Sequence, residues 1–335
     1  MSAKPFPILF VTASRIGDAV LASGLVQRLN AEIPEARFTI VGSPLTAPLF
    51  AEVPNLDRLI VMDKLPGSGH WFSLWRQVRG KRWGLVVDLR GSAIANVLRP
   101  RRRAVHRKGA KPVHKVIEAA RLLKLEADPP APYLYTSAET EARAEALTAG
   151  RGPILAMAPA ANWIGKTWPA ERFALVARRL LSPGGPMQGG RLMVLGGPED
   201  GAACDPVKAA VGRDYCIDLV GRESLLTCYA ALKRARLFIG NDSGLMHLAA
   251  AAGAPTLGLF GPSDEKLYRP WGLNARTVRG TRSLAEIRAQ DPTFSQAITH
   301  MMDLSADSVF GAACDLLEDS EDPAVLAAIA RTAND

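Results

Sequence analysis

A chain of 335 residues that is 48% hydrophobic and 22% charged has the composition of a soluble globular protein and is too long for one ordinary core, so we expect two domains. No run approaches the roughly 18–20 apolar residues of a membrane span. The N-terminus does not resemble a secretory leader, and four cysteines that lie 12 or more positions apart exclude a spaced zinc motif and favour a reducing cytoplasm. The net charge of +8 indicates an anionic partner or a solvated basic face.

The first half of the chain alternates short β-branched apolar runs with helical patterns, which is typical of βαβ units. Between the first two runs, residues 17–34 predict one crossover helix that ends at Pro34. The apolar runs predict buried parallel strands at 7–13, 37–42, 57–62 and 83–89.

A proline-rich segment at 126–136 interrupts this alternation, and residues 137–150 predict a connecting helix. From about 303 the tail returns to helical patterning. A second series of strands is predicted at 152–159, 191–197, 214–221, 236–242 and 255–261.

We therefore predict an α/β chain with two doubly wound parallel sheets. The predicted parts are an N-terminal domain at 1–136, the connecting helix at 137–150, a C-terminal domain at 151–302, and C-terminal helices at 303–335, for which packing back on the N-terminal domain is one arrangement. Ligands of such sheets bind at the carboxyl ends of the strands, and we expect the site in the cleft between the domains.

Residues 240–261 have the pattern of a strand, a polar turn and an Ala-rich helix. Ser243 and His247 stand four residues apart in one helix without a G-x-S-x-G elbow, which argues against a nucleophilic triad with Asp242. A metal site would need ligands that no neighbouring residue supplies. Unpaired N–H groups at the helix start, with Gly244 allowing close approach, predict an anion site. For His247 alone, a bond from a buried helix to a neighbouring loop stays an alternative.

A second polar loop, within 158–173, leads from a strand to a helix and contains one charged residue before that helix, Lys166. A lysine at the carboxyl end of a strand can act as the counter-ion of a diphosphate. A solvated surface lysine is the alternative, which Trp163 and Trp168 disfavour because they indicate a packed loop.

The first strand-to-helix turn, at 12–20, contains only Gly17 and so lacks the glycine pattern of dinucleotide sites and P-loops. It supplies Asp18 to the predicted cleft, where the alternative role of this carboxylate is to complement the helix dipole. The turn after the fourth strand adds Asp88 and Arg90 to the same cleft.

Positive charge is concentrated at 99–115, where Arg101, Arg102 and Arg103 are consecutive. Such a patch can meet nucleic acid, anionic lipid headgroups or an acidic substrate. Aromatic residues are not interleaved as single-strand binding requires, and no zinc-finger or helix-turn-helix pattern is present, so we expect no nucleic-acid partner.

Segments 15–29 (RIGDAVLASGLVQRL), 165–173 (GKTWPAERF) and 240–264 (GNDSGLMHLAAAAGAPTLGLFGPSD) together resemble the signatures of bacterial ADP-heptose:lipopolysaccharide heptosyltransferases. The resemblance runs in order from about residue 8 to about 275, and the third segment is the most specific. It implies a GT-B fold of two Rossmann-like halves and an inverting transfer that needs no metal and no cofactor, with the ADP-sugar as a substrate.

The resemblance also suggests roles for individual residues. Asp18 matches the family's proposed catalytic base, and Lys166 matches its donor-phosphate lysine. Thr227 stands where members often have an acidic residue that binds the donor ribose, which leaves the identity of the donor open. The expected donor-binding residues are Asn162, Lys166, Thr227, Asp242, Ser243, Gly244 and His247. The expected acceptor-binding residues are Gly17, Asp88, Arg90, Arg101, Arg102 and Arg103.

We therefore expect a cytoplasmic, monomeric heptosyltransferase that modifies an anionic lipopolysaccharide-core acceptor, with peripheral contact at the cytoplasmic face of the inner membrane as a further expectation. Three alternatives stay open from the residues alone. They are a nucleotide-sugar epimerase or hydrolase of the same fold, a non-catalytic binding protein for an anionic glycan or nucleic acid, and an NAD-linked dehydrogenase, which the missing glycine fingerprint disfavours.

Overall fold

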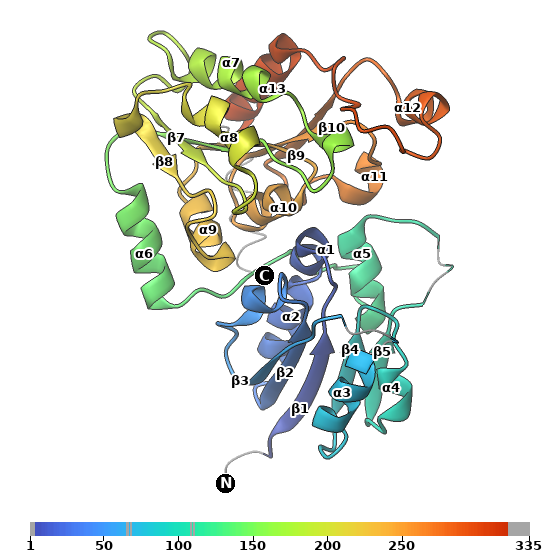
Figure 1. Ribbon diagram of the computed structural model, residues 1–335. Helices are drawn as coiled ribbons and strands as arrows, with labels where there is room; N and C mark the ends of the chain where they lie inside the picture. The colour runs from blue at the N-terminus through green and yellow to red at the C-terminus, as the bar shows by residue number, and fades with distance from the viewer. Residues whose placement is uncertain (1–3, 65–66, 68, 108, 110, 321–335) are drawn as a thin grey trace. The chain divides into compact units, whose positions relative to one another are not determined.

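The computed structural model describes residues 4–64, 67, 69–107, 109 and 111–320, and its chain divides into two compact units. Unit 1 is Met1–Ser137 and unit 2 is Ala138–Asp335. Each unit contains one parallel sheet with helices on both of its faces (Figure 1). The predicted α/β class with two doubly wound sheets is confirmed.

The sheet of unit 1 has the strand order β3-β2-β1-β4-β5, with every pair parallel. Four of these strands were predicted as buried apolar runs, which is wrong for the edge strand β3, where Ile60 is the one buried residue. Strand β5 was not predicted, because two of its four residues are exposed arginines. The strands are β1 (Phe6–Val11), β2 (Ala36–Gly42), β3 (Leu56–Val61), β4 (Leu85–Asp88) and β5 (Arg102–Val105).

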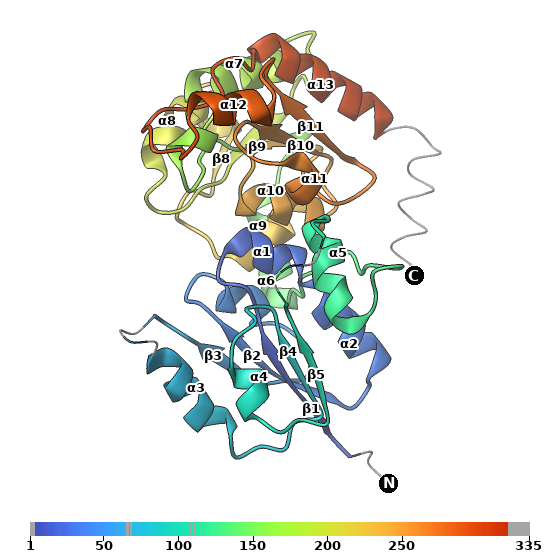
Figure 2. The ribbon, with the colours of Figure 1, turned by 90° about the vertical axis from the view of Figure 1, so that its right-hand side faces the viewer.

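The helices of unit 1 cover the two faces of its sheet separately. Buried side chains of α3 and α4 share one core with inward-facing residues of β1 and β4, whereas α1, α2 and α5 lie on the opposite face (Figure 2). The helices are α1 (Ile16–Leu21), α2 (Gly24–Glu32), α3 (Gly69–Val78), α4 (Ile94–Val97) and α5 (Lys115–Ala120), with 3-10 turns η1 (Ala47–Phe50) and η3 (Arg121–Leu123).

The single crossover helix predicted at 17–34 is two helices, α1 and α2, that meet at Ser23. The Ser23 hydroxyl donates to the Val20 carbonyl and accepts a bond from the backbone N–H of Tyr133. A Cβ on Gly24 would lie only 2.2 Å from the carbonyl oxygen of Ala131, so only glycine allows this backbone approach. The break therefore accommodates the segment that leaves unit 1.

The sheet of unit 2 has the order β11-β10-β9-β6-β7-β8 and is also parallel throughout. The edge strand β11 escaped prediction because its sequence, ARTVR, is partly exposed and contains two arginines instead of an apolar run. The strands are β6 (Ile154–Ala158), β7 (Arg191–Val194), β8 (Cys216–Asp218), β9 (Leu237–Asn241), β10 (Thr256–Phe260) and β11 (Ala275–Arg279).

Helices in unit 2 connect successive strands and add a C-terminal helix, α13. The helices are α6 (Ala138–Thr148), α7 (Ala170–Leu181), α8 (Gly201–Lys208), α9 (Leu225–Leu232), α10 (Gly244–Ala251), α11 (Glu265–Tyr268), α12 (Leu284–Gln290) and α13 (Ala306–Asp319), with 3-10 turns η4 (Ile164–Lys166) and η5 (Arg213–Tyr215). Helix α13 packs on α7 and β11 and contributes Val309, Ala313 and Leu316 to the core of unit 2. The rest of the predicted C-terminal helical segment, 321–335, lies outside the described residues.

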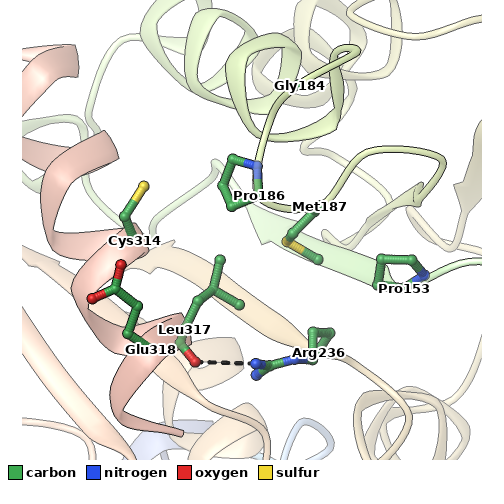
Figure 3. A pocket seen from close by; sticks show the side chains of 8 residues that line it. All are labelled: Pro153, Gly184, Pro186, Met187, Arg236, Cys314, Leu317 and Glu318. Carbon is green, nitrogen blue, oxygen red and sulfur yellow. Dashed lines mark hydrogen bonds between the residues drawn. The ribbon is translucent and has the colours of Figure 1, made fainter. Parts of the chain in front are cut away.

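A cavity of about 540 Å³ lies beside α13, near the amino ends of the strands of unit 2 (Figure 3). Pro153 and Arg236, which immediately precede β6 and β9, line it. The Arg236 guanidinium donates to the Leu317 carbonyl at 3.0 Å and so anchors the last turn of α13. The cavity is thus at the opposite end of the sheet from the predicted ligand site.

Two further expectations from composition can be compared with the structure. Within the part of the chain that is described, no helix is long and apolar enough to cross a membrane. All four cysteines are free thiols, and burial raises the pKa of Cys204 and of Cys228 to about 12, so these two act as small apolar side chains.

Candidate active site

The carboxyl edge of the unit 2 sheet brings Lys166 and Asp242 together. Strands β6 and β9 are neighbours, so the loop after Ala158 and the turn after Asn241 start side by side. Turn η4 then positions the Lys166 ammonium 2.5 Å from the Asp242 carboxylate, which is only 5% exposed. Both residues were predicted to bind the donor, but their ion pair was not predicted.

His247 lies on the other side of the same carboxylate. Its Nε2 atom is 3.9 Å from Asp242 Oδ1, and its side chain is buried within α10. Asp242 is therefore flanked by a lysine and a histidine, rather than acting as the third member of a serine triad. The arrangement places a lysine ammonium and an imidazole beside one buried carboxylate at the start of a helix.

Ser243 is the N-cap residue of α10, with extended backbone angles of φ −147° and ψ 172°. Its side chain does not cap the helix, and its buried hydroxyl has no hydrogen-bond partner among the described residues. Gly244 follows as the first helical residue, so the first-turn N–H groups have no intrahelical acceptor. A buried unpaired hydroxyl beside unpaired amides is the pattern expected where a polar ligand supplies the missing acceptor.

Asn241 connects the end of β9 with both ends of the loop at 159–168, which contains Lys166 and is called the lysine loop. Its amide nitrogen donates to the Pro159 carbonyl at 2.7 Å, and its amide oxygen accepts from the backbone N–H of Trp168 at 3.1 Å. The side chain is fully buried, so both bonds are protected from water. Sequence reasoning did not select Asn241, although an asparagine that ends a buried apolar strand was a usable signal.

A second support for the lysine loop comes from residues 291–300, which sequence reasoning also missed. The backbone N–H of His300 donates to the Gly165 carbonyl at 3.1 Å, and its Nε2 atom lies 3.3 Å from the buried Asp291 carboxylate. The Trp163 ring packs against Phe294 and His300, with ring centroids 5.5 and 5.8 Å away. No periodic pattern marks this segment, which explains why the sequence did not reveal it.

The two other predicted donor residues lie apart from these contacts. Asn162 is exposed in the lysine loop. Thr227 is buried in the first turn of α9, where its hydroxyl is 2.9 Å from that of the N-cap residue Ser224. A donor-binding role for Asn162 and Thr227 therefore stays a prediction.

In unit 1, Asp18 occupies the first turn of α1, which follows the carboxyl end of β1 after a short turn at 12–15. Asp18 and the preceding Gly17 are both half-buried. This position is the one that the sequence predicted, and the first turn of a helix favours a carboxylate electrostatically.

Asp88 ends β4 and is completely buried. One of its carboxylate oxygens accepts from the backbone N–H of Arg90, and the other accepts from the backbone N–H and hydroxyl of Ser92. Burial raises the pKa of Asp88, and the bonds from Ser92 and Arg90 oppose that shift only in part. Asp88 thus shapes the turn that presents Arg90, instead of facing a ligand as predicted.

Arg90 is held at the same edge with part of its guanidinium left unpaired. Its Nε atom donates to the Thr12 carbonyl at 2.9 Å, whereas its Nη2 atom is buried and has no hydrogen-bond partner among the described residues. The buried Thr12 hydroxyl is also unpartnered there. Burial lowers the pKa of Arg90, which the Asp88 charge opposes, but arginine stays protonated under physiological conditions. Arg90 therefore presents a desolvated cation suited to an anion.

Arg101, Arg102 and Arg103 were predicted to bind the acceptor together with Asp88 and Arg90, but the structure does not bring them to the same end of the sheet. Arg102 pairs with Leu85 at the amino end of β4, and Val105 pairs with Asp88 at its carboxyl end. Three residues of strand separate the two ends by about 10 Å. The arginines therefore lie toward the opposite edge of the sheet, and the error arose because β5 was not recognised.

Within the described ranges, no group of three or more His, Cys, Asp or Glu side chains is arranged to hold a metal ion. Asp242 and His247 thus lack the additional ligands that a protein metal site needs.

Known proteins resemble this chain over most of its length. The family described as glycosyltransferase family 9 (heptosyltransferase) matches residues 56–295. Lipooligosaccharide heptosyltransferase 2 of Haemophilus influenzae is 25% identical over 310 residues, which cover 81% of this chain and 88% of the relative.

Solved structures have the same fold. The E. coli ADP-heptose lipopolysaccharide heptosyltransferase II is 22% identical, with a TM-score of 0.73 over 94% of this chain and 100% of that chain. A family 9 glycosyltransferase from Veillonella parvula is also 22% identical, with a TM-score of 0.77 over 95% and 99%. These likenesses establish the predicted GT-B fold. Because the family match covers well over half of the sequence, the chain belongs to glycosyltransferase family 9, the heptosyltransferases.

Proposed function

We propose that this protein transfers a heptose from ADP-heptose to an anionic sugar of the lipopolysaccharide inner core, with inversion at the anomeric carbon. The names of its relatives support this substrate pair, since one is a lipooligosaccharide heptosyltransferase and another an ADP-heptose heptosyltransferase. The observation that carries the proposal is the Lys166–Asp242 pair beside the Ser243 hydroxyl at the start of α10, which has no partner among the described residues.

Unit 2 binds the donor diphosphate at that position. The first-turn amides of α10 and the Ser243 hydroxyl donate to phosphate oxygens, and the Lys166 ammonium adds a positive charge. Asp242 holds Lys166 in place before the donor arrives, so little reorganisation is needed. These groups stabilise the negative charge that develops on the departing ADP. We infer that no metal and no other cofactor is required for this step.

Asp18 acts as the general base in this proposal. The acceptor hydroxyl oxygen forms a bond to the anomeric carbon while the bond from that carbon to the diphosphate oxygen breaks. The hydroxyl proton passes to the Asp18 carboxylate, and the bonding electrons leave with ADP. Attack opposite the leaving group inverts the configuration, and the base contributes about 10²–10⁴-fold to the rate.

Arg90 binds an anionic group of the acceptor. Its Nη2 atom and the Thr12 hydroxyl, neither of which has a hydrogen-bond partner in the described part of the chain, provide donors at the carboxyl edge of unit 1. A carboxylate or phosphate of the core saccharide satisfies both, and arginine suits such anions because its donors are planar and fixed. The enzyme works as a monomer at the cytoplasmic face of the membrane that carries the acceptor.

A direct test measures product formation from ADP-heptose with and without a heptose-deficient core acceptor. Mass spectrometry should detect one added heptose and one released ADP per turnover, and NMR should give the inverted anomeric configuration. ADP-heptose consumption without acceptor would instead indicate a hydrolase or epimerase. Transfer that survives EDTA treatment of a metal-free preparation supports a metal-independent step, and loss of transfer that added metal restores would overturn it.

A further inference from the structure

One segment of unit 1 carries the positive charge of the whole chain. Residues 64–117 contain fourteen lysines and arginines but one acidic residue, Asp88, and this carboxylate is buried within its turn. The chain as a whole has a net charge of only +8, so the remaining residues are acidic on balance. The site at the carboxyl edge does not account for this excess of positive charge. Of the basic residues in this segment, Arg90 is the one that the turn after β4 holds at that edge.

Helices α3 and α4 lie side by side over one face of the unit 1 sheet (Figures 1 and 2). Val105 of β5 packs against the core beneath them, so Arg103, two residues earlier, points to the same face. We call the exposed surface formed there the α3–α4 face. Its exposed residues are Phe72, Arg76, Arg79, Val97, Arg99 and Arg103.

Exposed aromatic and apolar groups accompany these arginines. Phe72 is 62% exposed and stacks on Trp75 with a centroid distance of 5.7 Å, and Arg79 lies over the Trp75 ring at 4.8 Å. A groove of about 370 Å³ runs along this side of α3 between Phe72 and Arg76. Val97 of α4 is 58% exposed. Exposed apolar groups that are rimmed by polar residues often mark protein or membrane interaction sites.

Most arginines of this face also form no ion pair with the described residues. Among the described residues, Arg76, Arg99 and Arg103 form no ion pair, whereas nearby Lys81 pairs with Asp57 at 2.8 Å. Their charge is therefore available to an external anion. Aromatic side chains between unpaired basic residues, on a helix whose other side is buried, are typical of helices that lie in a membrane interface.

We propose that the α3–α4 face binds the surface of a bilayer containing anionic phospholipids, with Phe72 entering the headgroup region. Charge complementarity and the exposed apolar groups together select this occupant, since a bilayer supplies both anionic headgroups and an apolar layer that can accept Phe72 and Val97. The proposal extends the proposed function, because an acceptor anchored in a membrane is reached by an enzyme on its surface. Membrane binding itself needs neither donor nor acceptor.

The test is sedimentation of the full chain with vesicles of phosphatidylethanolamine and phosphatidylglycerol, compared with vesicles of phosphatidylcholine alone. We expect binding to the anionic vesicles, weakened by salt, and little to the neutral ones. Each basic residue contributes roughly fivefold to partitioning, so the triple variant Arg76→Gln, Arg79→Gln, Arg99→Gln should bind about 100-fold more weakly. The matched control replaces three exposed arginines of unit 2 by glutamine, Arg178, Arg213 and Arg288, and should bind vesicles like the wild type.

Phe72→Ser tests the apolar part separately, because it preserves charge and should reduce binding even at low salt. Equal losses in the face and control variants would overturn the proposal, as would tighter binding to an oligonucleotide than to anionic vesicles. Activity on a soluble, delipidated acceptor should not change in the face variant. If the wild type shows no transfer to that acceptor but still binds vesicles, the proposed function fails while the membrane surface stands.

Discussion

The carboxyl edges of the two sheets hold their polar residues in different ways. In unit 2, Lys166, Asp242 and Asn241 contact one another or the same loop, and most of these contacts are buried. In unit 1, Asp18 and Arg90 come from separate strand ends, and Arg90 is fixed mainly through the backbone of Thr12.

The difference follows from what each edge has to bind. A diphosphate is compact and carries the same charges in every turnover, so a cross-linked set of donors can be assembled around one place. A saccharide acceptor is larger and more varied, and a few anchored groups are enough to orient it. Mutations at the two edges should therefore separate donor effects from acceptor effects.

The largest effect is expected from Asp18→Asn, which keeps the size of the side chain but removes the base. We expect kcat to fall by about 10²–10⁴-fold, while ADP affinity measured by calorimetry stays within about twofold. Steady-state kinetics with both substrates saturating would measure this. A variant that keeps most of its kcat would show that Asp18 is not the base.

Lys166→Ala should come next, because it removes the charge that faces the leaving group. We expect a fall of about 10²-fold in kcat/KM for the donor, with stability lowered by about 1–3 kcal/mol because Asp242 loses its partner. The double variant Lys166→Ala, Asp242→Asn should recover stability but not activity. Recovery of both would mean that the ion pair is purely structural.

Arg90→Ala tests the other edge. The KM for an anionic acceptor should rise about 10- to 100-fold, as expected for loss of a charged hydrogen bond, with ADP affinity unchanged. An acceptor analogue without its carboxylates and phosphates should be used equally well by variant and wild type. If the analogue is affected as strongly as the native acceptor, Arg90 supports the fold instead of binding the anion.

The smallest effect is expected from Ser243→Ala, which separates ligand affinity from stability. The hydroxyl has no partner within the described protein, so its removal should leave the melting temperature unchanged or slightly higher. ADP affinity should nevertheless fall about three- to tenfold. Thermal unfolding with and without ADP measures both at once. Destabilisation of the ligand-free protein would indicate that the hydroxyl has a structural partner.

The sequence predicted the buried parts of the fold well, because parallel strands covered on both sides are continuous apolar runs such as those of β1 and β9. It found the edge strands β3 and β8 but missed the other two, β5 and β11, because both contain arginines and neither forms an apolar run. Because β5 was not recognised as a strand, Arg101–Arg103 were predicted at the carboxyl end of the sheet, whereas they lie toward its amino end.

For the site, the sequence identified which turns carry polar residues but not how those residues meet. Lys166 and Asp242 are 76 positions apart, and their ion pair depends on β6 and β9 being neighbours. Asp88 was expected to face a ligand, yet its burial within the 88–92 turn is decided by local hydrogen bonds that composition does not reveal. The supporting segment around His300 has no periodicity and needed the structure.

The junction at Ser23 and Gly24 has a consequence for dividing the protein. Residues 131–133 cross this junction, where the carbonyl of Ala131 touches Gly24 and the N–H of Tyr133 binds the Ser23 hydroxyl. A fragment that stops after β5 lacks these residues. Its Ser23 hydroxyl would lose the Tyr133 N–H that donates to it, and the helix backbone at Gly24 would be exposed to water. Independent folding of the first unit should depend on keeping the chain through Ser137, and the shorter fragment should be prone to aggregation.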